Sequence, residues 1–225
     1  MLISLKYLNN KYHLNIKGVI HVGGHHGQEL ADYEKFDFKI IHIFEPLLKN
    51  FKILNKKISK FKNLEIFSYN YALGSKEDRV LMNCSSNDLE SSSILQPKIH
   101  LVQHPKIKFE EKEIVNLKDL DSFKIKNVNF LNIDVQGYEL EVLKGSKETL
   151  KYIDYVYCEI NRDETYEGNP LVEDIDFFLN QFNFKRCETK WASRSLSWGD
   201  AFYIRSNKVN LKTNLINNLK IFFLG

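Results

Sequence analysis

The chain has 225 residues, of which 43% are apolar and 27% charged, and its formal net charge is +3 at pH 7. This composition excludes a disordered chain, and the small charge, scattered along the sequence, argues against a nucleic-acid partner. The three cysteines lack metal-like spacing, and their odd number argues against a disulfide framework. The sequence also lacks an apolar run of bilayer length and a signal-peptide pattern, so we expect a cytoplasmic protein.

The first strong motif lies at residues 18–29. Val19–Val22 predicts a buried strand, Gly23, Gly24 and Gly27 predict a tight turn, and Gln28–Phe36 predicts a helix. Such a turn is the usual nucleotide-binding unit of an α/β sheet, and glycines let the backbone approach a ligand closely. The spacing does not match G-x-G-x-x-G, which disfavours a pyrophosphate and favours a nucleoside such as S-adenosylmethionine. A tight turn without a ligand is the alternative.

A second strand over Lys39–Phe44 ends in Glu45 and Pro46. Pro46 suits the first turn of a helix, whose apolar positions recur at helical spacing: Leu47, Phe51, Leu54 and Ile58. Glu45, which ends the strand after the glycine turn, can accept hydrogen bonds from both ribose hydroxyls. The alternative role is a carboxylate that stabilises the helix N-terminus.

Residues 76–120 interrupt the alternation of strands and helices. We expect an insertion of two strands and a mobile loop, because loops this long commonly act as lids. His100 and His104 lie four residues apart, as metal ligands on a helix do, but the neighbouring Pro105 favours a surface pair. We expect no required metal, with magnesium at carboxylates near the acceptor as the alternative.

The remaining predicted elements are strand 64–69, strand 129–135, helix 138–150, strand 153–160, helix 171–182 and strands 184–189 and 201–205. This alternation predicts an α/β protein with a doubly wound, mostly parallel sheet and an antiparallel hairpin at one edge. We expect a single domain over residues 1–206. The tail, residues 207–225, predicts an amphipathic helix that packs on the body, with a homodimer contact as the second interpretation and a membrane-surface anchor as the third.

Several predicted strands end in polar residues at the same edge of the sheet, where ligands bind in doubly wound folds. Asp134 ends the very apolar strand 129–135, and it can cap the following helix or lie beside a reacting centre. The other polar residues at this edge are His25, His26, Asn70, Tyr71, Gln136, Tyr138, Glu139, Glu159 and Asn161.

These segments, taken in order, resemble the FkbM-type methyltransferases. The matching segments are residues 21–29, Glu45-Pro46, 70–74, Ser91-Ser92-Ser93, 131–145 and 198–201, within a similarity that runs from about residue 17 to residue 205. The most specific is 131–145, where the family usually shows Asp-x-Glu-Gly-x-Glu and then Leu-x-Gly. Gln136 stands in place of the usual glutamate, and His21 stands where many methyltransferases of this fold carry an acid.

The resemblance implies a Rossmann-like class I methyltransferase fold with seven strands, an antiparallel last strand and S-adenosylmethionine as cofactor. It implies methyl transfer to oxygen, often on a sugar or a natural product. The residues carried over are Gly23, Gly24, His25 and Gln28 around the methionine half, Glu45 at the ribose, Asn70 and Ala72 near the adenine, and Asp134 and Gln136 facing the sulfonium and the acceptor.

A sugar hydroxyl is a poor nucleophile until a general base removes its proton. Asp134 is the preferred base and His100 the second choice. The further candidates are Glu139, Glu159, His25, His26, His104 and Asp200. We expect the acceptor, a glycan, nucleotide sugar or small natural product, to contact the insertion, Tyr166, Asn169, Trp191 and Trp198. For the two tryptophans, a place in the apolar core is the equal alternative.

Two other functions stay open. A nicotinamide-dependent oxidoreductase is disfavoured by the missing G-x-G-x-x-G. A non-catalytic cofactor-binding or scaffold protein derived from the methyltransferase fold remains because Gln136 departs from the family pattern.

Overall fold

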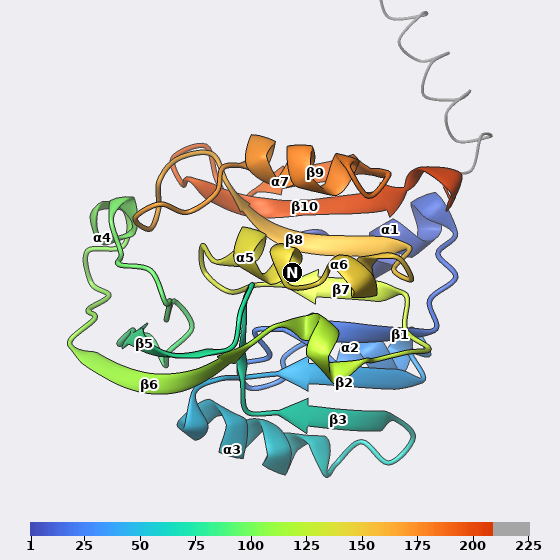
Figure 1. Ribbon diagram of the computed structural model, residues 1–225, viewed down its shortest axis with the longest axis horizontal. Helices are drawn as coiled ribbons and strands as arrows, with labels where there is room; N and C mark the ends of the chain where they lie inside the picture. The colour runs from blue at the N-terminus through green and yellow to red at the C-terminus, as the bar shows by residue number, and fades with distance from the viewer. Residues whose placement is uncertain (209–225) are drawn as a thin grey trace, which may run out of the picture.

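The computed structural model describes residues 1–208, and its main element is a seven-stranded sheet in the order β3-β2-β1-β7-β8-β10-β9 (Figure 1). The strands are β1 (Gly18–Val22), β2 (Ile40–Phe44), β3 (Glu65–Tyr69), β7 (Phe130–Ile133), β8 (Tyr155–Asn161), β9 (Phe184–Trp191) and β10 (Trp198–Arg205). All neighbours pair in parallel except β10, which is antiparallel to both β8 and β9. The prediction of a doubly wound, mostly parallel sheet closed at one edge by an antiparallel pair is therefore confirmed.

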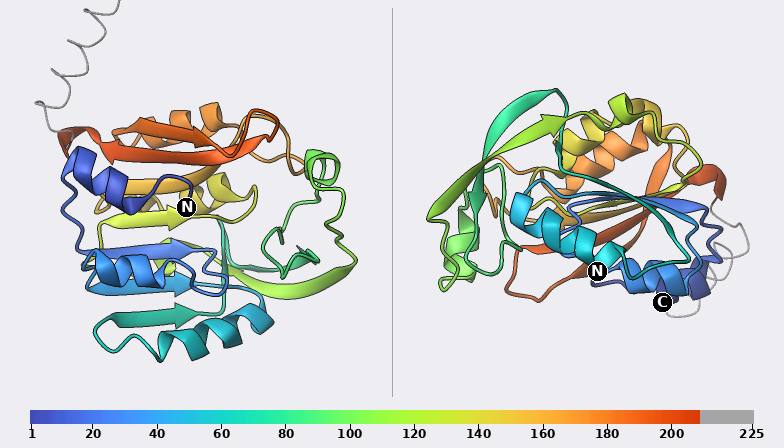
Figure 2. Two further views of the ribbon diagram at one scale, coloured as in Figure 1. Left: turned by 180° about the vertical axis from the view of Figure 1, so that it is seen from behind. Right: turned by 90° about the horizontal axis from the view of Figure 1, so that it is seen from below.

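Helices cover both faces of this sheet (Figure 2). One face carries α1 (Leu5–Tyr12), α2 (Leu30–Lys35) and α3 (Leu48–Ile58), and the other carries α5 (Glu139–Lys144), α6 (Lys147–Leu150) and α7 (Val172–Asn180). Two separate apolar clusters result, one on each side of the central strands. The central strands are buried on both faces, which explains why they read as continuous apolar runs in the sequence.

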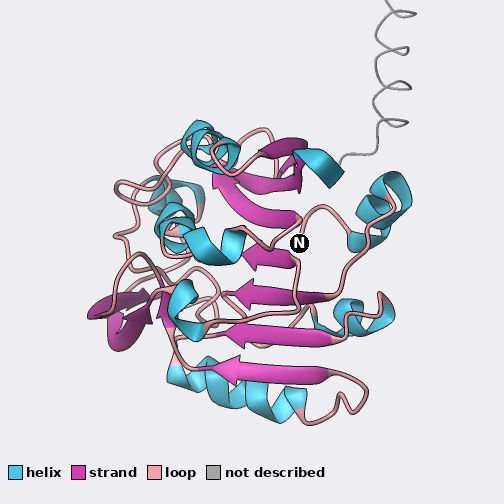
Figure 3. Cartoon of the chain, turned by 45° about the vertical axis from the view of Figure 1, so that its right-hand side comes forward, coloured by secondary structure: helices cyan, strands magenta, loops and turns pink. Residues whose placement is uncertain are grey.

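The insertion forms a second, three-stranded sheet in the order β4-β6-β5. Its elements are β4 (Ala72–Leu73), β5 (Asp78–Cys84), α4 (Ile99–Gln103) and β6 (Glu111–Lys118), followed by the 3₁₀ turn η1 (Leu120–Phe123). This sheet lies beyond the carboxyl ends of β1, β2 and β7 (Figures 1 and 3). Leu47, Met82 and Leu117 belong to the small apolar cluster that fixes it there. The two long strands were predicted, whereas two-residue β4 is too short to leave a sequence pattern.

The helix predicted over residues 138–150 is two helices, α5 and α6. A Cβ on Gly145 would lie 1.9 Å from the Gly74 carbonyl oxygen, so this position admits only glycine and brings the chain against β4. Ser146 then donates to the Val142 carbonyl at 2.5 Å, a local bond that competes with helix continuation.

Two further findings concern the ends of the chain. Helix α1 was not predicted; its N-cap, Ser4, accepts a hydrogen bond from the Tyr7 amide. The prediction of an amphipathic tail and a dimer contact concerns residues 207–225, nearly all of which lie outside the described residues; η2 (Ser206–Lys208) ends the described chain. Across residues 1–208, no helix combines the length and apolar character that crossing a membrane requires.

Candidate functional site

A cavity of about 600 Å³ lies at the carboxyl ends of the parallel strands, under the insertion. This volume falls in the range of about 300–1,000 Å³ typical of small-molecule sites. The residues proposed from the sequence for the cofactor or for catalysis that lie on its wall are Gly23, His25, Gln28, Glu45, Ala72, His100, His104, Asp134, Gln136, Glu159 and Asp200. Four others do not line it: Gly24, His26, Asn70 and Glu139.

The glycine turn after β1 packs closely against its own protein neighbours. Gly23 has φ +88°, and a Cβ there would lie 1.8 Å from the Asp134 carbonyl oxygen. A Cβ on Gly24 would lie 2.4 Å from Ile43 Cγ1. These glycines therefore let the turn pack against β2 and the end of β7, while Gly23 also lines the cavity. A contact between these glycines and a cofactor stays a prediction.

Glu45 ends β2 and is 4% exposed on the cavity wall. Its carboxylate accepts hydrogen bonds from the His25 amide at 2.8 Å and the Leu47 amide at 2.9 Å. Burial raises the pKa of Glu45 to about 7, against the lowering effect of these two amides. Each carboxylate oxygen keeps a lone pair, so the group can still accept hydrogen bonds from a ligand.

Asn70 supports this strand end instead of facing the cavity. Its Nδ2 donates to the carbonyl oxygens of Glu45 at 2.9 Å and Pro46 at 2.8 Å. The proposed contact between Asn70 and an adenine therefore has no basis in the side-chain geometry, while Ala72, two residues later, does line the wall.

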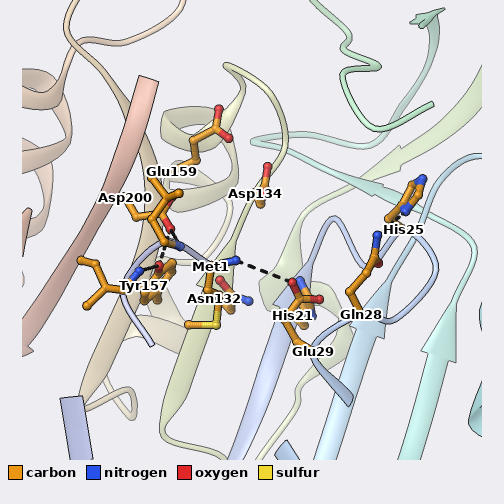
Figure 4. A network of polar contacts seen from close by, with 12 residues as sticks. Met1, His21, His25, Gln28, Glu29, Asn132, Asp134, Tyr157, Glu159 and Asp200 are labelled. Carbon is orange, nitrogen blue, oxygen red and sulfur yellow. Dashed lines mark hydrogen bonds and ion pairs between the residues drawn. The ribbon is translucent and has the colours of Figure 1, made fainter. Parts of the chain in front are cut away.

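A group of acidic side chains forms the opposite side of the cavity (Figure 4). Gln136 joins two of them, because its Nε2 donates to Asp134 Oδ1 and to Glu159 Oε2, both at 2.8 Å. Asp134 is exposed, whereas Glu159 is buried. Burial and the nearby Asp134 carboxylate raise the pKa of Glu159 well above its usual range.

Asp200 completes this acidic group from the antiparallel strand β10, where it pairs with Glu159 of β8. It accepts hydrogen bonds from the Tyr157 hydroxyl and from the Leu2 amide. Burial raises the pKa of Asp200. Tyr157 and Leu2 both line the cavity and were missed from the sequence. For Tyr157 a signal existed, since it lies two positions before Glu159 on the same face of the strand.

Glu139 stabilises a loop and does not face the cavity. It is 1% exposed, and its Oε1 accepts hydrogen bonds from the amides of Val135 at 3.2 Å and Gly137 at 3.0 Å. It thereby holds the loop that presents Asp134 and Gln136. A catalytic role for Glu139, as expected from the sequence, does not fit a carboxyl that is away from the cavity wall.

His100 and His104 both line the cavity, so the expectation of a surface pair was wrong. His100 is 4% exposed, and its Nδ1 is buried with no hydrogen-bond partner among residues 1–208. Burial lowers the pKa of His100 to about 4, which keeps the ring neutral at pH 7.

Only some of the residues expected to contact the acceptor line the cavity. Trp198 lines the cavity, whereas Trp191 does not and stacks under the Arg162 guanidinium, 5.1 Å from the ring centroid. Tyr166 lies behind the wall, with its hydroxyl 3.0 Å from Gln136 Oε1 and 2.9 Å from the Ser91 carbonyl oxygen. It therefore joins the insertion to Gln136.

The strand order of this sheet is that of a Rossmann-like methyltransferase fold. The cavity at the ends of β1, β2 and β7 and the buried acid after β2 agree with this fold. The chain belongs to the FkbM methyltransferase family, because residues 21–186 match the family model described as "Methyltransferase FkbM domain". This family uses S-adenosylmethionine as its methyl donor.

One curated relative is the 2-O-methyltransferase NoeI of Sinorhizobium fredii, 30% identical over 119 residues, which cover 48% of this chain and 49% of NoeI. The match thus spans about half of that relative's length. Among solved structures, the FkbM methyltransferase of Methylobacillus flagellatus has a TM-score of 0.55 and 13% identity, over 84% of this chain and 43% of that one. Magnesium protoporphyrin IX methyltransferase of Synechocystis, solved with S-adenosylhomocysteine, has a TM-score of 0.52 and 10% identity, over 89% and 79%. Both structures share the fold.

Proposed function

We propose that this protein is an S-adenosylmethionine-dependent O-methyltransferase that acts on a sugar hydroxyl of a glycan or of a neutral small natural product. The observation that carries the proposal is the placement of Glu45 and the group of Asp134, Gln136 and Glu159 on the wall of one cavity, in a chain of the FkbM family. The name of NoeI as a 2-O-methyltransferase supports oxygen as the accepting atom.

The residues at this cavity fit the cofactor. The Glu45 carboxylate can accept from the two ribose hydroxyls, since each of its oxygens has a lone pair left beside its backbone bond. The apolar side chains of Leu47, Ala72 and Met82 form a surface of the wall that suits an adenine. Gly23, His25 and Gln28 would hold the methionine half. Gln28 Nε2 lies 2.8 Å from His25 Nδ1, which fixes both side chains beside the turn.

The cofactor, when bound, supplies a methyl group already activated on a sulfonium, so the protein has to position the acceptor and remove its proton. We assign Asp134 as the base, because it is exposed on the cavity wall. The Gln136 amide fixes Asp134 by a hydrogen bond to Oδ1 and leaves Oδ2 to accept the proton of the acceptor hydroxyl. Glu159 is less suited, since burial raises its pKa and so disfavours the ionised form that a base requires.

The charge of the wall favours a neutral or cationic acceptor over a phosphorylated one. Within residues 1–208, the cavity is lined by no lysine or arginine, and the Met1 ammonium on its wall lies 3.9 Å from Glu29. Six carboxyl side chains line it: Glu29, Glu45, Glu90, Asp134, Glu159 and Asp200. The raised pKa values of Glu45, Glu159 and Asp200 reduce their negative charge, but they bring no positive charge to the wall. A nucleotide sugar carries a pyrophosphate, which proteins usually bind with cationic side chains or helix N-termini. We therefore favour a glycan or natural product over a nucleotide sugar among the acceptors expected from the sequence.

Calorimetric titration of the protein with S-adenosylmethionine and separately with NAD tests this function. We expect saturable binding of S-adenosylmethionine alone, lost in Glu45→Ala. Methylation of neutral oligosaccharides, measured with a labelled methyl donor, should fall about 10²-fold or more in Asp134→Asn, with cofactor affinity retained. Binding without turnover on any acceptor would support the scaffold function, and full activity of Asp134→Asn would remove Asp134 as the base.

A further inference from the structure

Two histidines of the glycine turn and one aspartate of the insertion meet beside the cavity. His25 and His26 follow β1, and their rings stack with centroids 3.9 Å apart. Asp88 comes from the loop after β5, between Asn87 and Leu89, which both line the cavity. One ligand atom from each of these three side chains lies within 4.8 Å of the other two. Three potential metal ligands are therefore brought together from segments 62 residues apart.

The ring of His26 is held by a buried residue. Asn50 of α3 is 1% exposed, and its Oδ1 lies 3.1 Å from His26 Nε2. An amide oxygen only accepts, so Nε2 carries the proton and Nδ1 of the neutral ring keeps its lone pair. Metal-binding histidines are oriented in the same way, by a hydrogen bond from the ring nitrogen that does not bind the metal.

The free nitrogen of His26 faces a carboxylate. His26 Nδ1 lies 3.6 Å from Asp88 Oδ2. A cation placed between these two atoms would be bound by the lone pair of Nδ1 and by the carboxylate. Ligands of a tetrahedral zinc ion, with bonds of about 2.0–2.1 Å, are about 3.3 Å apart. A small movement of the exposed Asp88 side chain would therefore let one cation bind both atoms.

His25 is turned toward the same residue, and both of its ring nitrogens have partners. Nδ1 accepts from Gln28 Nε2 at 2.8 Å, so Nε2 carries the proton and donates to the Asp88 carbonyl oxygen at 2.7 Å. His25 must therefore release one of these two exposed partners to bind a cation, whereas His26 Nδ1 needs no such change. Lys49 contacts the other carboxylate oxygen of Asp88, at 3.3 Å from Oδ1, which leaves Oδ2 for a cation. The Lys49 side chain is 63% exposed, so solvent screens its charge.

We propose that His25, His26 and Asp88 form a binding site for Zn²⁺ or a similar divalent transition metal. Two imidazole nitrogens and one carboxylate suit zinc, whereas Mg²⁺ and Ca²⁺ prefer all-oxygen sites. The ion would join the glycine turn to the loop after β5 and so hold the insertion over the cavity. This site goes beyond methyl transfer, because binding of the ion needs neither cofactor nor acceptor.

The test uses the full chain, stripped with a chelator and titrated with zinc chloride at pH 7.5. We expect one ion per chain, no displacement by millimolar Mg²⁺, and a tetrahedral absorption spectrum when Co²⁺ replaces zinc. His26→Gln and Asp88→Asn should each weaken zinc binding at least about tenfold. Asn50→Leu should weaken it about 10–100-fold through the orientation of His26. Thermal unfolding of each variant checks that it is folded.

His13→Gln and Asp37→Asn are the matched controls, since both residues are exposed and lie outside this cluster; they should bind zinc as the wild type does. Three results would overturn the proposal: no saturable zinc binding, unchanged affinity in both His26→Gln and Asp88→Asn, or displacement by Mg²⁺. Titration with S-adenosylmethionine in the same preparation keeps these results separate from the proposed function.

Discussion

The amide of Gln136 connects the acidic side of the cavity to the insertion. One side chain donates to two carboxyl groups and accepts from Tyr166, and its backbone carbonyl accepts from Ser93 at 2.7 Å. A glutamate, the residue usual in the family at this position, could not donate both bonds when ionised. Gln136 therefore keeps two carboxyl groups close without adding a third one.

Replacing this amide should change the pH dependence of catalysis. In Gln136→Glu a third carboxyl would lie beside Asp134 and Glu159, and like charges raise the pKa of carboxyl groups. We expect the acid limb of the pH–rate profile to move to higher pH, with activity falling most below pH 7. Gln136→Met, which is uncharged and of similar size, is the control and should lower the rate without this displacement of the limb. An unchanged acid limb in Gln136→Glu would show that this group does not supply the base.

Glu45 should make cofactor affinity depend on pH. Its pKa of about 7 means that the carboxylate, the better acceptor for ribose hydroxyls, forms as the pH rises through neutrality. Between pH 6 and pH 8 we expect the affinity for S-adenosylmethionine to rise by up to about tenfold, in proportion to the ionised fraction. Glu45→Gln should bind more weakly and lack this component. Equal pH dependence of the wild type and Glu45→Gln in calorimetry would contradict the ribose contact.

At the level of single elements, the loop between β7 and α5 depends on one buried acid. In Glu139→Ala the amides of Val135 and Gly137 would lose their acceptor, and each buried unsatisfied donor costs about 1–3 kcal/mol. We expect urea denaturation to show a loss of about 2–6 kcal/mol for the two donors together. Glu139→Gln, which keeps Oε1, should lose about 1 kcal/mol or less. Similar losses in both variants would mean that the charge, rather than the acceptor, is what the loop requires.

The sequence was sufficient for elements with strong periodicity. The strand predicted over 39–44 is Ile40–Phe44, because a buried parallel strand is apolar throughout. The strand predicted over 64–69 is Glu65–Tyr69, an edge strand in which exposed and half-buried residues alternate from Glu65 to Ser68. The ends of β2 and β7 place Glu45 and Asp134 on the wall of one cavity, as their positions in the sequence predicted. Helix α1 and strand β4 were missed because they are short and take their stability from packing on residues far along the chain.

Contacts across the insertion could not be predicted. His26 contacts Asp88, and Tyr166 contacts Ser91. Both contacts depend on how the second sheet packs against the carboxyl ends of the strands of the main sheet. Asn70 illustrates the opposite difficulty, since its position in the sequence suggested the cavity while its side chain bonds to the backbone of Glu45 and Pro46. Sequence order fixes which strand end a residue follows, but not which way its side chain turns.

For the whole molecule, the buried ionisable groups predict how stability changes with pH. The folded pKa is raised for four buried carboxyl groups: Glu45, Glu139, Glu159 and Asp200. It is lowered for three histidines: His21, His42 and His100. The folded state thus holds carboxyl protons that the unfolded chain releases above about pH 4.5, while the unfolded chain gains histidine protons below about pH 6.5.

These two effects oppose one another between pH 4.5 and 6.5, so stability should change little there. Above pH 6.5 only the carboxyl effect remains, and the free energy of unfolding should fall by about 1.4 kcal/mol per pH unit for each proton still retained. Urea denaturation at pH 5.5, 6.5, 7.5 and 8.5 measures this, and Glu45→Gln should reduce the decline. Stability that increases steadily from pH 6.5 to 8.5 would contradict the protonated state of the buried acids.

The position of β10 between β8 and β9 also bears on how the protein is made. Asp200, the last acid of the cavity, enters from a strand near the end of the described chain, whereas Gly23 and His25 lie near its start. During synthesis the first strands leave the ribosome long before β10 exists, and pairing over such a sequence separation is slow. The growing chain can therefore build most of its sheet while the cavity still lacks one wall. Competence to bind the cofactor would then be acquired late, when the final hairpin docks.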